Sequence, residues 1–369
     1  GQCLLVTAND LIMVFIALEI SSIATYVLAG YLRDDRRNNE SALKYFLLGS
    51  FATAFLLYGV AWIYGLVGHT NLDEVRRVLS DPGASISSVL AGIACALILV
   101  GFAFKVSAAP FQIWAPDVYQ GASTPVTAFM SAAPKAAAFA VFLRVFLTAF
   151  APLSTRWVPL IWSCALLTMF VGNLAALMQS NVKRLLAYSS IAHAGYILVA
   201  FTANSKLGTS AAMFYLAAYA LMNVGAFAVI SHVAAKNERY VKVGDLAGLA
   251  KRQPATAALL ALFVFSLIGM PLTGGFFAKF YVFRAALDSH LVWLTVLGLA
   301  NSAVAAYYYL KIVGAMYMQE PGESMESLGP LAPGTKIAIW ASAVGTLLLG
   351  IFPSLLLPFA SYSASLIAR

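Results

Sequence analysis

The chain has 369 residues, of which 61% are hydrophobic and only 10% are charged. Soluble domains carry about a quarter of charged residues, so a water-soluble protein of this length could not cover so much apolar surface. The net charge of +8 would suggest a nucleic-acid partner in a soluble protein, but here short basic loops that fix membrane topology account for it. The apolar runs are long and do not alternate with polar residues, which excludes an outer-membrane barrel and predicts an all-α polytopic membrane protein.

Apolar runs of about 20 residues predict about ten transmembrane helices. In chain order these runs cover residues 11–32, 42–67, 86–105, 125–150, 157–178, 182–202, 209–235, 255–283, 290–318 and 335–359. The third run meets Pro110, and the eighth is interrupted by Gly269, Pro271 and Gly274. Two similarly broken helices indicate a transport site within paired repeats. The chain begins at Gly1 and runs directly into apolar sequence, so we expect it to be a fragment of a longer protein.

Basic residues in the loops predict the orientation of the helices. One set of loops carries Arg33, Arg36, Arg37, Lys183, Arg184, Lys236, Arg239, Lys242, Lys251, Arg252 and Lys336. The opposite set carries Arg76, Arg77, Arg156, Lys206, Arg284 and Arg369. The first, larger set is predicted to face the cytoplasm, which leaves the C-terminus outside. Lys183 and Arg184 are interpreted as anchors of this topology.

Ionisable side chains inside the spans are the candidate functional residues, because each costs roughly 2.5–3.5 kcal/mol at the bilayer centre. They are Glu19, Lys44, Lys105, Lys135, His193 and Lys279. A buried lysine near a movable carboxylate can switch between its charged and neutral forms, so the set predicts a relay of protons through internal water. Hydroxyls that could hold that water are those of Ser107, Thr124, Thr127, Ser189, Ser190, Tyr219 and Thr273. Two alternatives stay open: Lys44 can reach the headgroups, and His193 can be a satisfied core histidine.

Several chemical signatures are missing from the sequence. No GxxxxGK[ST] phosphate loop is present, and Cys3, Cys95 and Cys164 lie far apart. We therefore expect neither ATP hydrolysis nor a metal or redox cofactor in this chain. The energy that drives transport would then have to come from outside this chain.

Three stretches resemble the antiporter-like membrane subunits of respiratory complex I. They are residues 104–126, which contain Lys105, Pro110 and Asp117, residues 181–193, and residues 269–281. The sequence of residues 117–121, together with lysines at 135 and 279, favours one subunit type of this family over two others. Gln112 departs from the pattern, because many relatives have histidine there, and glutamine cannot titrate.

The resemblance implies a fourteen-helix fold with two inverted five-helix repeats. Residues 1–150 would be the rest of the first repeat, from the end of helix 4 to helix 8. Residues 151–318 would be the second repeat, helices 9–13, and residues 319–369 would be helix 14. In the family, the glutamate of helix 5 pairs with the lysine of helix 7, which here implies Glu19 and Lys105. Lys44 matches a lysine of helix 6, Lys135 the central lysine of helix 8, and Lys279 the terminal lysine of helix 12.

The resemblance also implies a function and partners. The chain would move protons across the inner (plasma) membrane of a bacterium, driven by quinone reduction in other subunits. Quinone, NADH, FMN and iron–sulfur clusters would bind to those partner subunits, and no cofactor to this chain. Its own partners would be other membrane subunits of complex I, the lipid bilayer, protons and internal water, with no nucleic acid. The alternatives are a subunit of a multisubunit sodium/proton antiporter, an assembly scaffold and, more distantly, a solute carrier.

Overall fold

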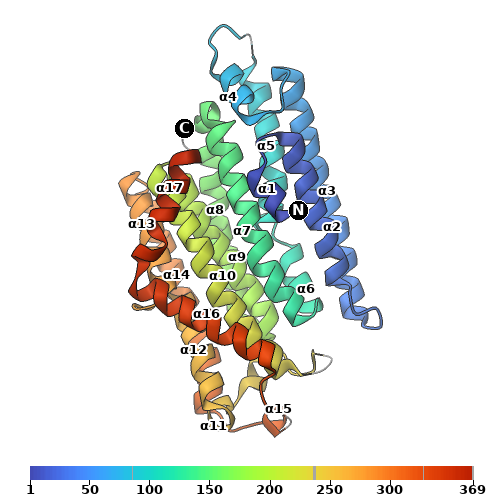
Figure 1. Cartoon of the computed structure of the whole chain (residues 1–369), viewed down its shortest axis with the longest axis vertical. Helices are drawn as coiled ribbons and strands as arrows, with labels where there is room; N and C mark the ends of the chain where they lie inside the picture. Colours follow the sequence, from blue (N-terminus) through green and yellow to red (C-terminus); the bar gives the residue numbers. More distant parts are fainter. Residues whose placement is uncertain (85, 236–237, 327, 368–369) are drawn as a thin grey trace.

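The computed structural model describes residues 1–84, 86–235, 238–326 and 328–367. Within these ranges the chain forms helices and no strand. The α-helices are α1 (Gln2–Thr7), α2 (Leu11–Ala29), α3 (Arg36–Val67), α4 (Leu72–Ser80), α5 (Ser88–Lys105), α6 (Trp114–Gly121), α7 (Thr124–Thr148), α8 (Ser154–Leu177), α9 (Val182–Thr202), α10 (Lys206–Ala234), α11 (Leu249–Arg252), α12 (Pro254–Ile268), α13 (Gly274–Asp288), α14 (Val292–Met318), α15 (Glu323–Glu326), α16 (Pro333–Ile351) and α17 (Leu357–Ile367). Most of the long helices run roughly along the long axis of one bundle, and α16 crosses it obliquely (Figure 1).

Nine helices in the described ranges are long and apolar enough to cross a membrane. They are α2, α3, α5, α7, α8 with the preceding 3₁₀ turn, α9, α10, α14 and α16. The remaining predicted span, residues 255–283, is the pair α12 and α13, each 15 residues long. The expectation of about ten spans, two of them broken, is therefore confirmed.

Proline and positive-φ residues explain both breaks. α5 ends at Lys105, Ser107 has φ 62°, and Pro110 precedes the start of α6 at Trp114. α12 ends at Ile268, where Gly269 adopts φ 96° and donates its N–H to the last turn. Proline has no N–H to donate, and glycine takes a left-handed conformation without steric cost, so each sequence ends its helix within the bundle.

The last predicted span is wrong in its extent. Residues 335–359 do not form one helix, because α16 ends at Ile351 and a separate α17 begins at Leu357. Phe352 lies between them with φ −124° and ψ 67°, outside the helical region. The clash of a proline ring with the preceding residue disfavours helix there, and Pro353 follows directly.

Helix α9 lies at the centre of the bundle, and 94% of its most apolar 18-residue stretch is buried. Small residues allow its close packing against α8. A Cβ on Gly172 would lie 2.5 Å from the backbone nitrogen of Ala192, and one on Gly195 would lie 2.6 Å from the Met169 side chain. Glycines at a helix–helix contact bring the two backbones together, which is the usual way to pack membrane helices closely.

The same backbone connection occurs twice, at opposite ends of the bundle. Asp10, before α2, forms an isolated antiparallel bridge with Asn71, after α3. Asn181, before α9, forms one with Lys242, after α10. The first bridge lies at the end marked by α4, and the second at the end marked by α11 and α15 (Figure 1). In each half a broken pair follows the bridge, α5 and α6 in one and α12 and α13 in the other.

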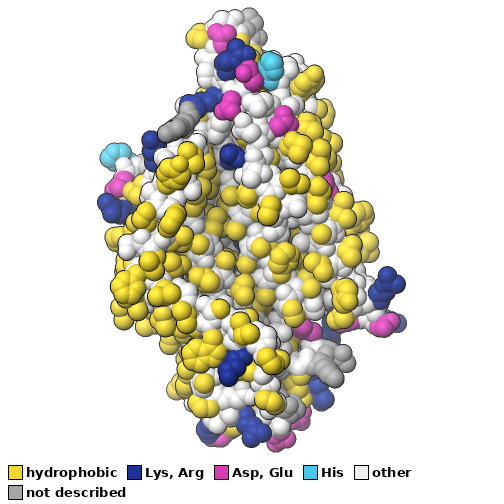
Figure 2. Space-filling view, in the orientation of Figure 1, with side chains coloured by type: hydrophobic (Ala, Val, Ile, Leu, Met, Phe, Trp, Pro, Cys, Tyr) yellow, Lys and Arg dark blue, Asp and Glu magenta, His cyan; other side chains and the backbone are white. Residues whose placement is uncertain are grey.

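Charged side chains gather at the two ends of the molecule, and the visible face between them is predominantly apolar (Figure 2). This distribution fits a multi-pass membrane protein. The loop before α3, α6 and α11 lie at one end, and α4 and α17 at the other (Figure 1). Lys236 and Arg369, used in the prediction of orientation, lie outside the described residues. Which end faces the cytoplasm stays a prediction.

Candidate functional site

Lys135 is buried in the middle of α7, where only 3% of its surface is exposed. Its ammonium donates hydrogen bonds to the backbone carbonyl of Ser190 on α9, at 2.9 Å, and to the Ser190 hydroxyl, at 2.5 Å. It also lies 5.9 Å from the centre of the Tyr219 ring. A buried ammonium requires hydrogen-bond acceptors, and here a carbonyl, a hydroxyl and an aromatic face supply them.

Lys279 is buried on α13, just beyond the second helix break. Its ammonium donates to the carbonyl of Ile268 at 2.8 Å and to the hydroxyl of Ser302 at 2.7 Å, and lies 4.9 Å from the Tyr196 ring centre. Ile268 is the last residue of α12, so its carbonyl has no partner within that helix. The negative end of the α12 dipole thus faces a cation, which is a direct consequence of the break.

His193 lies on α9 with 2% of its surface exposed. Its Nδ1 lies 2.6 Å from the Tyr215 hydroxyl, and its Nε2 lies 3.1 Å from the Tyr309 hydroxyl. The Tyr309 hydroxyl is also hydrogen-bonded to the Ser189 hydroxyl. Both ring nitrogens therefore have hydroxyl partners, and a titratable ring joins α9, α10 and α14.

One helix connects these groups. Ser189, Ser190, His193 and Tyr196 all lie on α9, and the last three follow the spacing of residues on one helix face. Ser190 contacts Lys135, and the Tyr196 ring contacts the ammonium of Lys279. The structure thus brings Lys135, His193 and Lys279, predicted from separate spans, to the neighbourhood of one buried helix.

Lys105, on α5, contacts the helix that carries Glu19, α2. Lys105, the last residue of α5, donates to the Ser22 hydroxyl at 2.8 Å and is 6% exposed. Ser22 follows Glu19 by three residues on α2, hence on the same side of that helix. Among the described residues no carboxylate lies within 4.0 Å of the Lys105 ammonium. The pairing of Glu19 with Lys105 stays a prediction.

Lys44 lies apart from the buried lysines, in a charged cavity of ≈ 170 Å³ near the end of α6. Its ammonium pairs with Glu40 at 2.7 Å and with Asp117 at 2.9 Å, and its side chain is 43% exposed. Arg184 approaches the other oxygen of Asp117 at 2.6 Å. Burial raises the pKa of Asp117, but the hydrogen bonds from Lys44 and Arg184 outweigh it and hold that pKa below its ordinary value.

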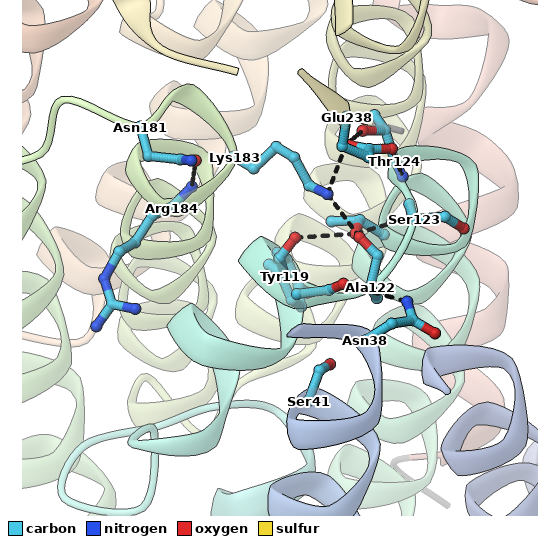
Figure 3. A network of polar contacts seen from close by, with 12 residues as sticks. Asn38, Ser41, Tyr119, Ala122, Ser123, Thr124, Asn181, Lys183, Arg184 and Glu238 are labelled. Carbon is cyan, nitrogen blue, oxygen red and sulfur yellow. Dashed lines mark hydrogen bonds and ion pairs between the residues drawn. The ribbon is translucent and has the colours of Figure 1, made fainter. Parts of the chain in front are cut away.

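Lys183, interpreted as an anchor of the topology, lies buried at the start of α9 and not exposed in a loop; its role in orientation stays a prediction. Its side chain is 1% exposed and donates to the Glu238 carboxylate at 2.9 Å and to the Ala122 carbonyl at 2.5 Å. Figure 3 shows it pointing away from Arg184, its neighbour in sequence, towards the start of α7. Sequence reasoning also missed Glu238. The burial of Lys183 could have been predicted, because Lys183 precedes Ser190 by seven residues, or two helical turns, and so lies on the same buried face of the helix.

Five buried polar atoms have no hydrogen-bond partner within the described part of the chain. They are Glu19 Oε1, Ser107 Oγ, Gln112 Oε1, Tyr219 OH and Asn223 Oδ1. Buried polar groups almost always bind a partner, which is ordered water where no protein group is available. Ser107 follows Lys105 by two residues, and Tyr219 contacts Lys135, so these atoms mark positions for water beside the lysines.

No group of three or more histidine, cysteine or acidic side chains is close enough to hold a metal ion in residues 1–84, 86–235, 238–326 and 328–367. The chemistry visible in the site is therefore that of lysines, hydroxyls, one imidazole and one carboxylate. Such groups accept and release protons.

Comparisons with known proteins identify the family of this chain. A family model described as NADH:quinone oxidoreductase/Mrp antiporter, TM, matches residues 8–305. NADH-quinone oxidoreductase subunit N 1 of Solibacter usitatus is 64% identical over 99% of this chain and 75% of its own length. NADH-quinone oxidoreductase subunit N of Trichlorobacter lovleyi is 48% identical over all of this chain and 75% of its own length.

Solved structures give the same result. A chain of respiratory complex I from Thermus thermophilus with bound aureothin is 40% identical, with a TM-score of 0.84 over 97% of this chain and 77% of that one. A chain of the Mrp complex from Dietzia sp. is 23% identical, with a TM-score of 0.87 over 98% of this chain and 74% of that one, and shows the shared fold alone. The chain belongs to the NADH:quinone oxidoreductase/Mrp antiporter family and, within it, to the subunit N group of NADH-quinone oxidoreductases.

Proposed function

We propose that this membrane subunit moves protons through a buried relay of carboxylate, lysines and water, driven by quinone reduction in partner subunits. Glu19 and Lys105 form the switchable pair of the half where protons are taken up, Lys135 is the central member, and Lys279 serves the exit half or the link to a neighbour. Lys44 and His193 are accessory members. Quinone, NADH, FMN and the iron–sulfur clusters belong to the partner subunits.

One observation carries the proposal: each of the three buried lysines donates a hydrogen bond to a serine hydroxyl on a neighbouring helix. Lys105 binds Ser22, Lys135 binds Ser190, and Lys279 binds Ser302. A carboxylate partner would hold a lysine in its charged form. A hydroxyl accepts from an ammonium and can equally donate to a neutral amine, so it supports both protonation states. The arrangement therefore suits groups that change charge during turnover.

Lys183 provides the contrast within the same chain, because it is equally buried but pairs with a carboxylate. If the buried lysines only held helices together, a similar pairing would be expected for Lys105, Lys135 and Lys279, since leaving a buried charge without a counter-charge is costly. This difference favours the relay over the scaffold interpretation.

The test uses the assembled complex in inverted membrane vesicles, with proton uptake measured per NADH oxidised. Lys135→Met, Lys279→Met and Glu19→Gln each remove a titratable group and keep most of the side-chain volume. We expect each to lower the number of protons moved per NADH, while Lys251→Met leaves it unchanged, because Lys251 is 54% exposed and pairs only with the exposed Glu320 among described residues. Full pumping in all three variants, with normal assembly, would overturn the relay and leave the scaffold. Pumping that depended on sodium would favour the antiporter alternative.

We also propose that the chain divides as the resemblance implies, into residues 1–150, 151–318 and 319–369. The two equivalent bridges, each before a broken helix pair and at opposite ends of the bundle, support this division. The end with α11 would face the cytoplasm, because it carries the larger set of basic residues, and the C-terminus would lie outside. Labelling of single cysteines introduced near α4 and α11 with an impermeant reagent tests the orientation.

A further inference from the structure

Glu238 occupies a strained position in the loop that follows α10. Its φ of 54° lies in the left-handed region, which non-glycine residues rarely adopt. The side chain is 21% exposed, so its carboxylate lies between the surface and the interior. Figure 3 shows it directed at the start of α7, the helix that carries Lys135.

The carboxylate replaces the missing cap of α7. Ser123, at the N-cap position, makes no capping hydrogen bond through its side chain in the described structure. Instead, Oε1 of Glu238 accepts from the backbone N–H of Thr124 at 2.7 Å, and Oε2 accepts from the Thr124 hydroxyl at 2.6 Å. The ammonium of Lys183 donates to the same Oε2 at 2.9 Å. The carboxylate thus contacts the first hydroxyl of α7 directly and is held in place from α9.

A stripe of buried hydroxyls leads from that contact to Lys135. Thr124, Thr127, Ser131 and Lys135 are spaced by three, four and four residues, which places them on one face of α7. The three hydroxyl residues are 0% exposed. Successive side chains at this spacing lie about 5–6 Å apart, a gap that a single water molecule can bridge.

The part of the stripe next to Lys135, around Ser131, offers sites for such water. Asn223 of α10 donates through Nδ2 to the Ser131 hydroxyl at 2.6 Å. Its Oδ1 and the hydroxyl of Tyr219 beside Lys135 are buried and make no close hydrogen bond in the described residues, although the two side chains lie near each other. The hydroxyls of Thr127 and Ser131 donate to the backbone carbonyls of Tyr119 and Ala128. Water therefore has to link the polar groups that follow one another between Glu238 and Lys135.

We propose that Glu238 is the residue at which protons are taken up for Lys135, and that Thr124, Thr127 and Ser131 conduct them. A proton from the aqueous phase binds the Glu238 carboxylate. Each hydroxyl or bridging water then accepts one proton from one side and releases one to the other. The last proton binds the neutral amine of Lys135, and Glu238 returns to its ionised form. The inference rests on the proposed relay, in which Lys135 alternates between neutral and charged.

An ion pair with a purely structural role is the competing explanation, and a double substitution separates the two. Glu238→Gln removes the proton-binding group but also leaves Lys183 as a lone buried charge, which is strongly destabilising. The double variant Lys183→Met, Glu238→Gln removes that charge as well. A structural pair would be replaced by apolar and amide groups at little cost, whereas an uptake residue would still be missing.

The experiment measures proton uptake by inverted vesicles that contain the assembled complex. We expect Glu238→Gln and the double variant to lower the initial rate at least about tenfold, a modest effect for the loss of a proton donor. Glu238→Asp keeps the carboxylate and should recover most of the rate. Thr127→Val should lower it, and Thr127→Ser should not. Glu320→Gln is the matched control, because Glu320 also pairs with a lysine but is 84% exposed.

Two outcomes would overturn the proposal. Normal uptake in the double variant would show that Glu238 acts only as the partner of Lys183, and normal uptake in Thr127→Val would show that the stripe does not conduct. Either result together with loss of pumping in Lys135→Met leaves the relay intact and moves its uptake route elsewhere. Normal pumping in Lys135→Met as well would mean that the relay itself has failed.

Discussion

Gly275→Ala tests whether the second helix break positions Lys279. A Cβ at Gly275 would lie 1.8 Å from the backbone carbonyl oxygen of Ser266, a contact to rigid backbone. The two helix ends have to separate by at least about 1.2 Å to reach the shortest tolerated contact, and overpacking of this kind costs about 1–3 kcal/mol. The hydrogen bond from the Gly275 N–H to the Ser266 hydroxyl, 3.1 Å long, would also weaken.

The separation matters for function because Lys279 lies one turn beyond Gly275 and donates across the break to Ile268 at 2.8 Å. Lengthening that distance by about 1.2 Å takes it beyond hydrogen-bond range. We therefore expect Gly275→Ala to lower both the thermal midpoint of the assembled complex and the protons moved per NADH.

The matched control is Gly314→Ala on α14, where no described atom lies within 4 Å of the added Cβ. This substitution should lower neither quantity, because alanine is the better helix former and the added Cβ meets no clash. Equal thermal midpoints and equal pumping in the two variants would refute the reasoning that the tight break holds Lys279.

Two further substitutions test other contacts of the site. Asp117→Asn should lower the thermal midpoint at pH 7, by about 1 kcal/mol in stability, because Lys44 keeps Glu40 and Arg184 keeps Gln120 as partners. The pKa of Asp117 in the folded protein lies below its ordinary value of 3.8, so its stabilisation is complete above pH 3.8 and is lost as the pH falls through the folded pKa. The thermal midpoints of the parent protein and of Asp117→Asn should therefore converge in acid. A difference that stayed constant with pH would contradict this. Tyr309→Phe removes the hydroxyl between Ser189 and His193 and should lower the rate of proton uptake. Tyr317→Phe is the control, because Tyr317 is exposed on the same helix, and it should leave the rate unchanged. Equal rates in the two variants would exclude a role for the Tyr309 hydroxyl.

Local sequence patterns predict the spans, both breaks and the burial of Lys105, Lys135, His193 and Lys279, but they do not predict that Lys183 is buried or that Lys44 is 43% exposed. These features are local: hydrophobic length sets a span, and proline or glycine ends a helix wherever it stands. The cost of burying a charge likewise marks Lys135 and Lys279 without knowledge of their neighbours. The final span is the exception: hydrophobic length predicts one helix there, but Pro353 disfavours the helical conformation at Phe352 and divides it.

Only the tertiary structure decided which groups these residues touch. Lys135 and Ser190 lie 55 residues apart in the chain, and Thr124 and Glu238 lie 114 apart. Such partners are chosen by how the helices pack, which no local pattern of residues encodes. The same packing buried Lys183 against Glu238 while its neighbour Arg184 remained near the surface, because successive residues on a helix face different directions.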